Sequence, residues 1–137
     1  NIDVENYKEN SRTVVDLYKG AEKYILKGKS HQSVTLVTKV LLGVFAVIPA
    51  YDRFFRDSFS DIAGNECGFS TPNKKSLEII YQFYIENKEE IEKLSNEIKV
   101  FDFYGQPTKY YYSKAKIIDM YGFQVGYMKL GKNNQFR

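Results

Sequence analysis

One apolar run, at residues 38–55 (TKVLLGVFAVIPAYDRFF), constrains the fold more than any other feature of the chain. The rest is strongly polar by comparison, since 27% of all residues are charged. No other segment could remove as much apolar surface from water per residue, so this run is expected at the centre of the core. Its most apolar part, residues 40–50, is eleven residues long. Because about 20 residues are needed to cross a bilayer, the run predicts a core segment and no membrane partner.

Proline divides this run into two predicted helices. The first is predicted over residues 34–47 and is apolar on nearly all sides, as a helix is when other helices surround it. Pro49 should end it, because proline disfavours the helical conformation in the preceding residue. Proline also suits a first helical turn, so the next helix is predicted over residues 49–62. Together the two helices form a predicted helix-turn-helix unit.

Three further segments carry apolar residues at helical spacings of three, four and seven. They predict helices over residues 3–27, 74–99 and 114–128. The charged stretch at residues 86–90 marks either a solvated face or a break in the second of these helices. In the third, Gly122 and Gly126 would allow another helix to approach closely.

The region at residues 100–112 is the least helical part of the chain. It is rich in Tyr and Phe around Gly105 and Pro107. Aromatic residues favour strands and the Gly-Gln-Pro sequence favours a turn, which predicts either an irregular segment or a short hairpin. The predicted fold class is therefore all-α, with about five packed helices.

The length of 137 residues suits a single domain. The chain begins with Asn1 rather than Met, so we expect a processed or truncated piece of a longer protein. The polar residues 130–137 are expected to form a frayed tail.

The charge and the aromatic content are compatible with two kinds of surface. The net charge is +3, and residues 105–137 hold six basic residues against one acidic residue, Asp119. The chain also contains 12 tyrosines and 10 phenylalanines but no tryptophan. Their rings either pack into the core, with tyrosine hydroxyls at the surface, or form a stacking and recognition surface.

The sequence lacks the residues that most enzymes and metalloproteins require. One cysteine, Cys67, and one histidine, His31, cannot form an internal disulfide or a Cys/His metal site. No glycine-rich phosphate loop, G-x-S-x-G or H-E-x-x-H motif is present. We therefore predict no metal and no cofactor, and the single cysteine indicates a reducing, cytoplasmic setting.

Lys39 and Asp52 are the candidate catalytic pair. A lysine on an apolar helix must extend to solvent, find a partner or lose its proton. In a functional interpretation, Lys39 is a nucleophilic amine and Asp52 orients it or stabilises a cationic intermediate. In a structural interpretation, Asp52 stabilises the N-terminus of its helix while Lys39 covers apolar surface. Nearby, Arg53 and Arg56 either bind phosphate or pair with neighbouring aspartates.

Basic and aromatic residues are interleaved in the stretch from Lys109 to Lys116. Such a pattern can follow a nucleic-acid backbone while the rings stack on bases, with Lys109, Lys114 and Lys116 contacting phosphate. The alternative is an exposed loop whose tyrosines fold over the core.

Several motifs resemble one family of proteins. They are TK-x-LLG at residues 38–43, PAYDR-x-F at 49–55, NKKS at 73–76, FY-x-ENKE at 83–89 and K-x-IDM at 116–120. Together they resemble the C-terminal half of an uncharacterised family of bacterial proteins. That resemblance implies a missing N-terminal helical half and brings no known activity.

A shorter region is similar to the catalytic region of helix-hairpin-helix DNA glycosylases. There a lysine opens an apolar helix, and a proline and an aspartate begin the next. The similarity implies that Lys39 takes the place of the catalytic lysine and Asp52 that of the aspartate, although the Leu-Pro-Gly-x-Gly hairpin of that superfamily is absent. We therefore expect a helical nucleic-acid-binding module of this type, with DNA as partner. The alternative is a non-enzymatic interaction or regulatory module of a bacterial or phage-encoded system, which binds a protein partner or itself.

Overall fold

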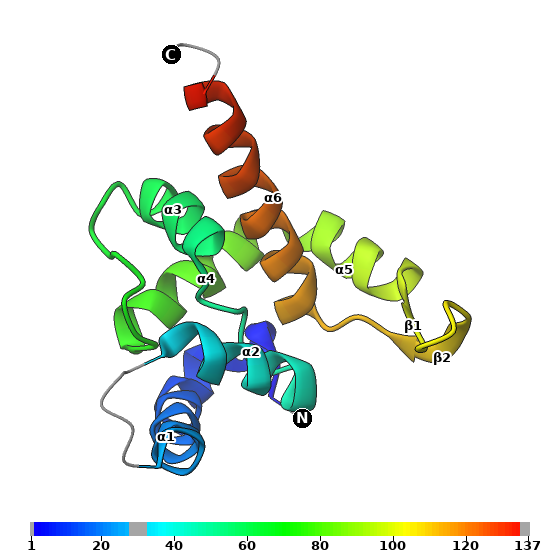
Figure 1. Ribbon diagram of the computed structural model, residues 1–137, viewed down its shortest axis with the longest axis horizontal. Coiled ribbons are helices and arrows are strands. Elements are labelled where there is room, and N and C mark those ends of the chain that lie inside the picture. The colour runs from blue at the N-terminus through cyan, green and yellow to red at the C-terminus, as the bar shows by residue number, and fades with distance from the viewer. Residues whose placement is uncertain (1, 28–32, 135–137) are drawn as a thin grey trace.

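The computed structural model describes residues 2–27 and 33–134, which form six α-helices, one 3-10 helix and one two-stranded sheet (Figure 1). The elements in chain order are η1 (Val4–Asn6), α1 (Tyr7–Leu26), α2 (Val34–Phe45), α3 (Arg53–Ile62), α4 (Lys74–Glu86), α5 (Lys88–Glu97), β1 (Lys99–Phe101), β2 (Pro107–Tyr111) and α6 (Lys114–Asn134). Because the sheet is one short hairpin, the predicted all-α class is confirmed, and so is the hairpin.

The helices pack around α6 and α1. Helix α6 packs against α3 and α5, while α1 packs against α2 and α4. In Figure 1, α1 and α2 lie at the lower end, α6 crosses the middle, and the C-terminal end of α6 projects beyond the other helices at the top. The hairpin projects to the right, away from the helical body (Figure 1).

The apolar run does form the centre of the core, as predicted. Leu41, Ile48, Tyr51 and Phe55 are completely buried. The ring of Phe55 stacks on that of a second phenylalanine one turn further along α3, with centroids 4.3 Å apart. Aromatic rings from α3 and its neighbours thus form one continuous cluster.

The connection between α2 and α3 is longer than predicted, and Pro49 lies within it rather than in a helical turn. Helix α2 ends at Phe45, and the next helix begins only at Arg53. Two hydrogen bonds attach Tyr51 to α2: its N–H donates to Thr38 Oγ1, and its carbonyl accepts from Thr35 Oγ1. Helix α3 then begins after Asp52, whose side chain caps it.

Helix α2 is more exposed than its composition suggested. Its buried face consists of Val37, Thr38, Leu41 and Leu42, whereas Val44 is exposed. The prediction that other helices surround α2 is therefore wrong, and one apolar face of this helix meets solvent.

The predicted helix over residues 74–99 is two helices. The break lies at Asn87, whose backbone N–H bonds back to the carbonyls of Phe83 and Tyr84, and whose side chain bonds to Phe83 as well. Asn87 both ends α4 and precedes the first residue of α5. Local hydrogen bonding by one asparagine thus breaks a continuous apolar periodicity.

Helix α6 is fixed at its start by the beginning of the chain. The carboxylate of Asp3 accepts the backbone N–H groups of Lys114 and Ala115, both at 2.9 Å. The helix continues to Asn134 instead of ending near residue 128. Of the predicted frayed tail, residues 130–134 are therefore helical, and residues 135–137 lie outside the described part of the chain.

The predicted close approach at the two glycines of α6 is confirmed. A Cβ atom built on Gly126 would lie 2.2 Å from the carbonyl oxygen of Phe54, and one on Gly122 would lie 2.5 Å from a ring atom of Phe55. Only glycine at these positions lets α3 and α6 pack at this distance.

Candidate functional site

A groove of about 1,180 Å³ follows the N-terminal half of α6. Its walls come from α2, the α2–α3 connection, α5 and the hairpin, and most of the side chains that line it are apolar. The charged residues of the lining are Lys39, Asp52, Glu90, Lys116 and Asp119. The groove therefore contains both residues of the predicted catalytic pair.

Lys39 and Asp52 reach the same groove without forming an ion pair. Lys39 is exposed on α2 and takes part in none of the ion pairs within the described residues. Asp52 is half-buried, and its Oδ1 accepts the N–H of Phe55 at 3.0 Å, which caps α3. Asp52 is therefore the N-cap of α3.

Asp119 is a buried carboxylate that sequence reasoning did not select. It is 7% exposed; its Oδ1 accepts the backbone N–H of Ala50 at 3.0 Å, and its Oδ2 accepts from Lys116 Nζ at 2.8 Å. These contacts connect α6 to the α2–α3 connection and use both carboxylate oxygens. No local pattern singles out Asp119, because its partner Ala50 lies 69 positions away.

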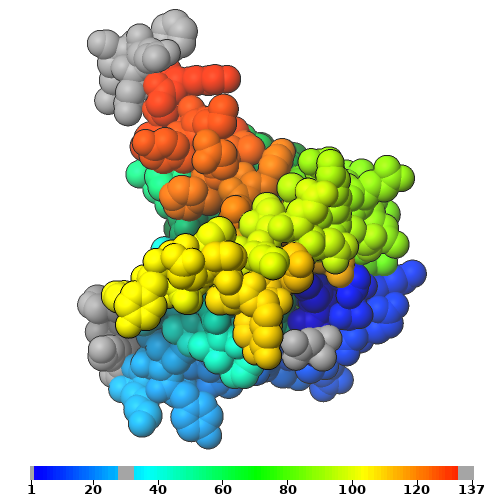
Figure 2. All heavy atoms as spheres, turned by 90° about the vertical axis from the view of Figure 1, so that its right-hand side faces the viewer, coloured from blue at the N-terminus to red at the C-terminus, as the bar shows by residue number. Residues whose placement is uncertain are grey.

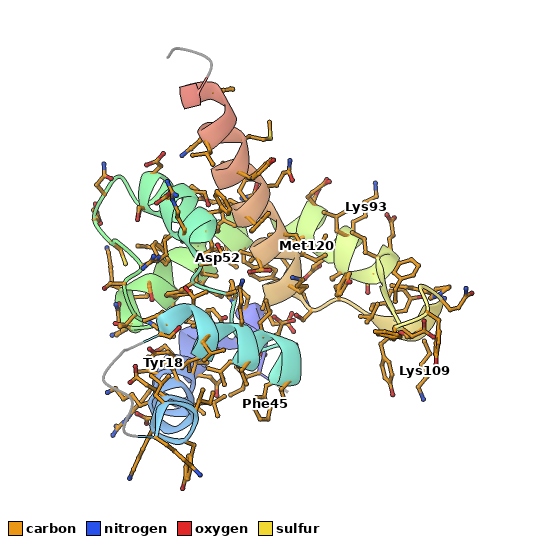
Figure 3. The ribbon with its side chains drawn as sticks, viewed as in Figure 1. Tyr18, Phe45, Asp52, Lys93, Lys109 and Met120 are labelled. Carbon is orange, nitrogen blue, oxygen red and sulfur yellow. The ribbon has the colours of Figure 1, made fainter. Side chains whose placement is uncertain are left out.

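Most of the predicted phosphate-binding residues are engaged within the molecule. Arg53 pairs with Asp57, Lys114 with Glu5, and Lys116 with Asp119. Arg56 is half-buried on α3, and Lys109 is exposed on β2. Figure 3 shows Lys109 on the projecting hairpin, far from Asp52 in the body. The five residues therefore do not form one basic surface.

A second, smaller hollow of about 360 Å³ lies between α3 and α6. Its charged residues are paired, Arg53 with Asp57 and Lys129 with Asp61. Since the charges are already neutralised, this hollow offers little to a charged ligand.

The tip of the hairpin holds two aromatic rings in solvent. Phe103 is 98% exposed and Tyr104 is 84% exposed. The loop beneath them is ordered by Asp102, whose Oδ1 accepts the backbone N–H groups of Tyr104 and Gln106. Gly105 follows with a φ of 75°, the left-handed region that glycine adopts without strain. The rings are thus presented by a defined turn and not by a loose loop.

Two lysines accompany the exposed rings of the hairpin. The amine of Lys99 lies 5.7 Å from the ring centroid of Tyr111, and that of Lys109 lies 5.3 Å from that of Tyr110. Neither lysine takes part in an ion pair within the described residues. Figure 2 shows the hairpin, in yellow, on the surface between α6 and α2. The sequence predicted Lys109 as a phosphate-binding residue of this region but did not single out Lys99.

Residues 2–27 and 33–134 contain no cluster of three His, Cys, Asp or Glu side chains suited to a metal ion. No helix in them is both long enough and apolar enough to cross a bilayer. Cys67 is a buried free thiol, and His31 lies outside the described residues.

Comparison with known proteins adds no identification. No protein-family model, no curated protein and no solved structure matches this chain.

Proposed function

We propose that the protein is a helical module that binds single-stranded nucleic acid through its hairpin. The observation that carries the proposal is the tip: Phe103 and Tyr104 are presented to solvent by a turn that Asp102 fixes. Unpaired bases stack on exposed aromatic rings, whereas a duplex hides the faces of its bases. Lys99 and Lys109, which lie beside the rings of Tyr111 and Tyr110 on the same hairpin and form no ion pair within the described residues, supply the charge that phosphates require.

A labelled oligothymidylate and a duplex of the same length test this proposal by fluorescence anisotropy at a series of salt concentrations. We expect tighter binding of the single strand. Since each phosphate contact on a single strand contributes about −0.7 to the slope of log K against log salt, contacts from Lys99 and Lys109 predict a slope near −1.4. Lys109→Gln should reduce the slope by about half.

Matched variants separate the hairpin from general surface effects. Replacing both Phe103 and Tyr104 by alanine should weaken binding at least about tenfold, because one stacked base contributes about 1–3 kcal/mol. The control is Tyr24→Ala, which removes a 73% exposed ring from α1. Absence of binding at low salt, equal loss in the control, or an unchanged affinity in the double variant would each refute the proposal.

The glycosylase-like roles of Lys39 and Asp52 form a separate part of the proposal. A nucleophilic Lys39 amine would condense with the aldehyde of an abasic deoxyribose, releasing water and forming an imine that borohydride reduces to a stable secondary amine. Crosslinking that Lys39→Gln abolishes would support this role. Asp52→Asn retains a capping side chain for α3, so it tests the carboxylate without removing the cap. No crosslink in the unmodified protein would leave Lys39 without a nucleophilic role.

A further inference from the structure

Helix α6 carries a half-exposed apolar stripe, part of which lines the groove and packs on rings of α3 and α4. Its members are Met120, Tyr121, Phe123, Tyr127 and Met128, which are 40–56% exposed, with Gln124 at the centre. They recur at spacings of three and four, so they share one side of the helix. Figure 3 shows Met120 on α6, near the middle of the molecule.

This stripe contains no charged residue. Between Ile117 and Gly131, the charged residues are Asp119 and Lys129. Both point elsewhere and are paired within the molecule, Asp119 with Lys116 and Lys129 with Asp61. A helix surface of four turns without charge is unusual for a face that meets only water.

The two halves of α6 present complementary shapes. Along its N-terminal half lies the large groove, whose walls include Ile91 and Leu94 of α5 and Tyr111 of the hairpin. The C-terminal half carries the half-exposed Tyr127 and Met128 and packs on α3 as far as Lys129, and its end projects beyond the other helices (Figure 1). One chain thus offers both a groove and a half-exposed apolar helix surface that could fill it.

We propose that the occupant of this groove is the C-terminal half of α6 from a second copy of the chain. With the two α6 helices antiparallel about a two-fold axis, the C-terminal half of each lies over the groove of the other. Such an interface is closed and reciprocal, because each copy contributes the same surface. The charges of the two surfaces are complementary. Glu90 lines the groove and Lys132 lies near the C-terminal end of α6, and neither forms an ion pair within the described residues.

The size of the surface fits an interface between copies. Five side chains of about 200 Å² each, half exposed, present about 500 Å² of largely apolar area. The largest apolar patch of a typical monomer is about 300–600 Å² and is often functional, so the stripe is a candidate for such a site. The walls of the groove add to it, toward the roughly 800 Å² per partner of a standard interface.

The register follows from the centre of the stripe. Met120 and Met128 are equidistant from Gln124, so an antiparallel pair places the axis at Gln124 and Met120 opposite Met128 of the other copy. The two Gln124 amides can then hydrogen-bond across the axis, a polar contact that specifies register in helical interfaces.

Cysteine crosslinking tests this register. Gln124→Cys should form an intermolecular disulfide on mild oxidation, because the two cysteines would face each other across the axis. Met120→Cys and Met128→Cys should crosslink when mixed but not separately. The control is Tyr24→Cys on α1, and native Cys67 is buried in every variant. Equal crosslinking of the control would overturn the register.

Sedimentation equilibrium at micromolar concentrations tests the association itself. We expect the mass of two chains, and a dissociation constant at least about tenfold weaker for Met120→Glu and Met128→Glu, because each buries a charge in an apolar interface. Tyr24→Glu is the matched control. A single-chain mass at every concentration, or a dimer that both glutamate variants leave intact, would overturn the proposal. These results do not depend on nucleic-acid binding, which the hairpin variants test.

Discussion

Gly126→Ala tests the close packing of α6 on α3. The added Cβ atom would lie 2.2 Å from the carbonyl oxygen of Phe54, whereas ordinary contacts begin near 3.4 Å. The obstacle is backbone and cannot rotate away. The two helices would therefore have to separate by about 1 Å, which would loosen the rings of Phe55 and Phe59 where they pack on Gly122.

Two opposing effects determine the size of the change. Overpacking a core costs about 1–3 kcal/mol, and a clash with rigid backbone belongs at the upper end, about 3 kcal/mol. Alanine recovers about 1 kcal/mol relative to glycine inside a helix. We therefore expect Gly126→Ala to lower the free energy of unfolding by about 2 kcal/mol.

Urea unfolding followed by circular dichroism measures this change. With an m-value of about 1.5 kcal/mol/M, the midpoint should fall by about 1.3 M at unchanged m. The control is Gly20→Ala in α1, where a Cβ atom meets nothing within 4 Å. That variant should gain about 0.5–1 kcal/mol from helix propensity alone. If Gly126→Ala proves as stable as the unmodified protein, the close approach of the two helices is refuted.

Asp119→Ala should destabilise the fold by about 2–3 kcal/mol in the same assay, because it leaves the Ala50 N–H without its partner, while Asp119→Asn, which retains an acceptor, should lose less. Asp3→Ala removes the carboxylate that accepts the N–H groups of Lys114 and Ala115, while Ser113 Oγ still accepts that of Lys116, and should cost about 1–2 kcal/mol. Burial raises the pKa of the Tyr7 and Tyr51 hydroxyls above the ordinary value of 10.0. Their contribution to stability is therefore complete below about pH 10 and is lost as the pH rises further, by about 1.4 kcal/mol per pH unit for each tyrosine. Urea midpoints measured from pH 9 to 12 should show this decline, with a shallower slope in either Tyr→Phe variant.

Local pattern was sufficient to predict the elements and the central segment. The apolar run at residues 38–55 supplies Leu41, Ile48 and Phe55 to the core, as its composition required. The hairpin was predictable because aromatic residues surround Gly105 and Pro107. In each case the signal lies within about ten residues of the structure that it predicts.

Contacts between distant segments were not predictable in the same way. Thr35 and Thr38 of α2 bond to the backbone of Tyr51, and no local pattern shows that pairing. Part of the cap of α6 comes from Asp3, more than a hundred residues earlier. Helical periodicity continues through Asn87, so only the charged stretch at residues 86–90 indicated a break there, as one of two alternatives.

The same difference between local and distant contacts applies to the candidate site. The sequence predicted Lys39 and Asp52 as a pair, and the structure places both at one groove. It could not show that Lys114 pairs with Glu5, because that pairing depends on the tertiary fold, whereas Lys116 and Asp119 pair locally, three residues apart on α6. The partners of a charge, more than its identity, decide whether it is available to a ligand.

The exposed rings of the hairpin and those of α6 require different explanations. On the hairpin, Asp102 accepts two backbone N–H groups, and the turn that results holds Phe103 and Tyr104 in one place. A loop ordered before binding loses less conformational entropy when a ligand arrives, so this rigidity favours recognition over accidental exposure. The stripe of α6 is instead uncharged and lies on an already rigid helix. Rings beside lysines suit an anionic ligand, and an uncharged helical stripe suits another apolar surface, so one chain carries two surfaces with separate chemistry.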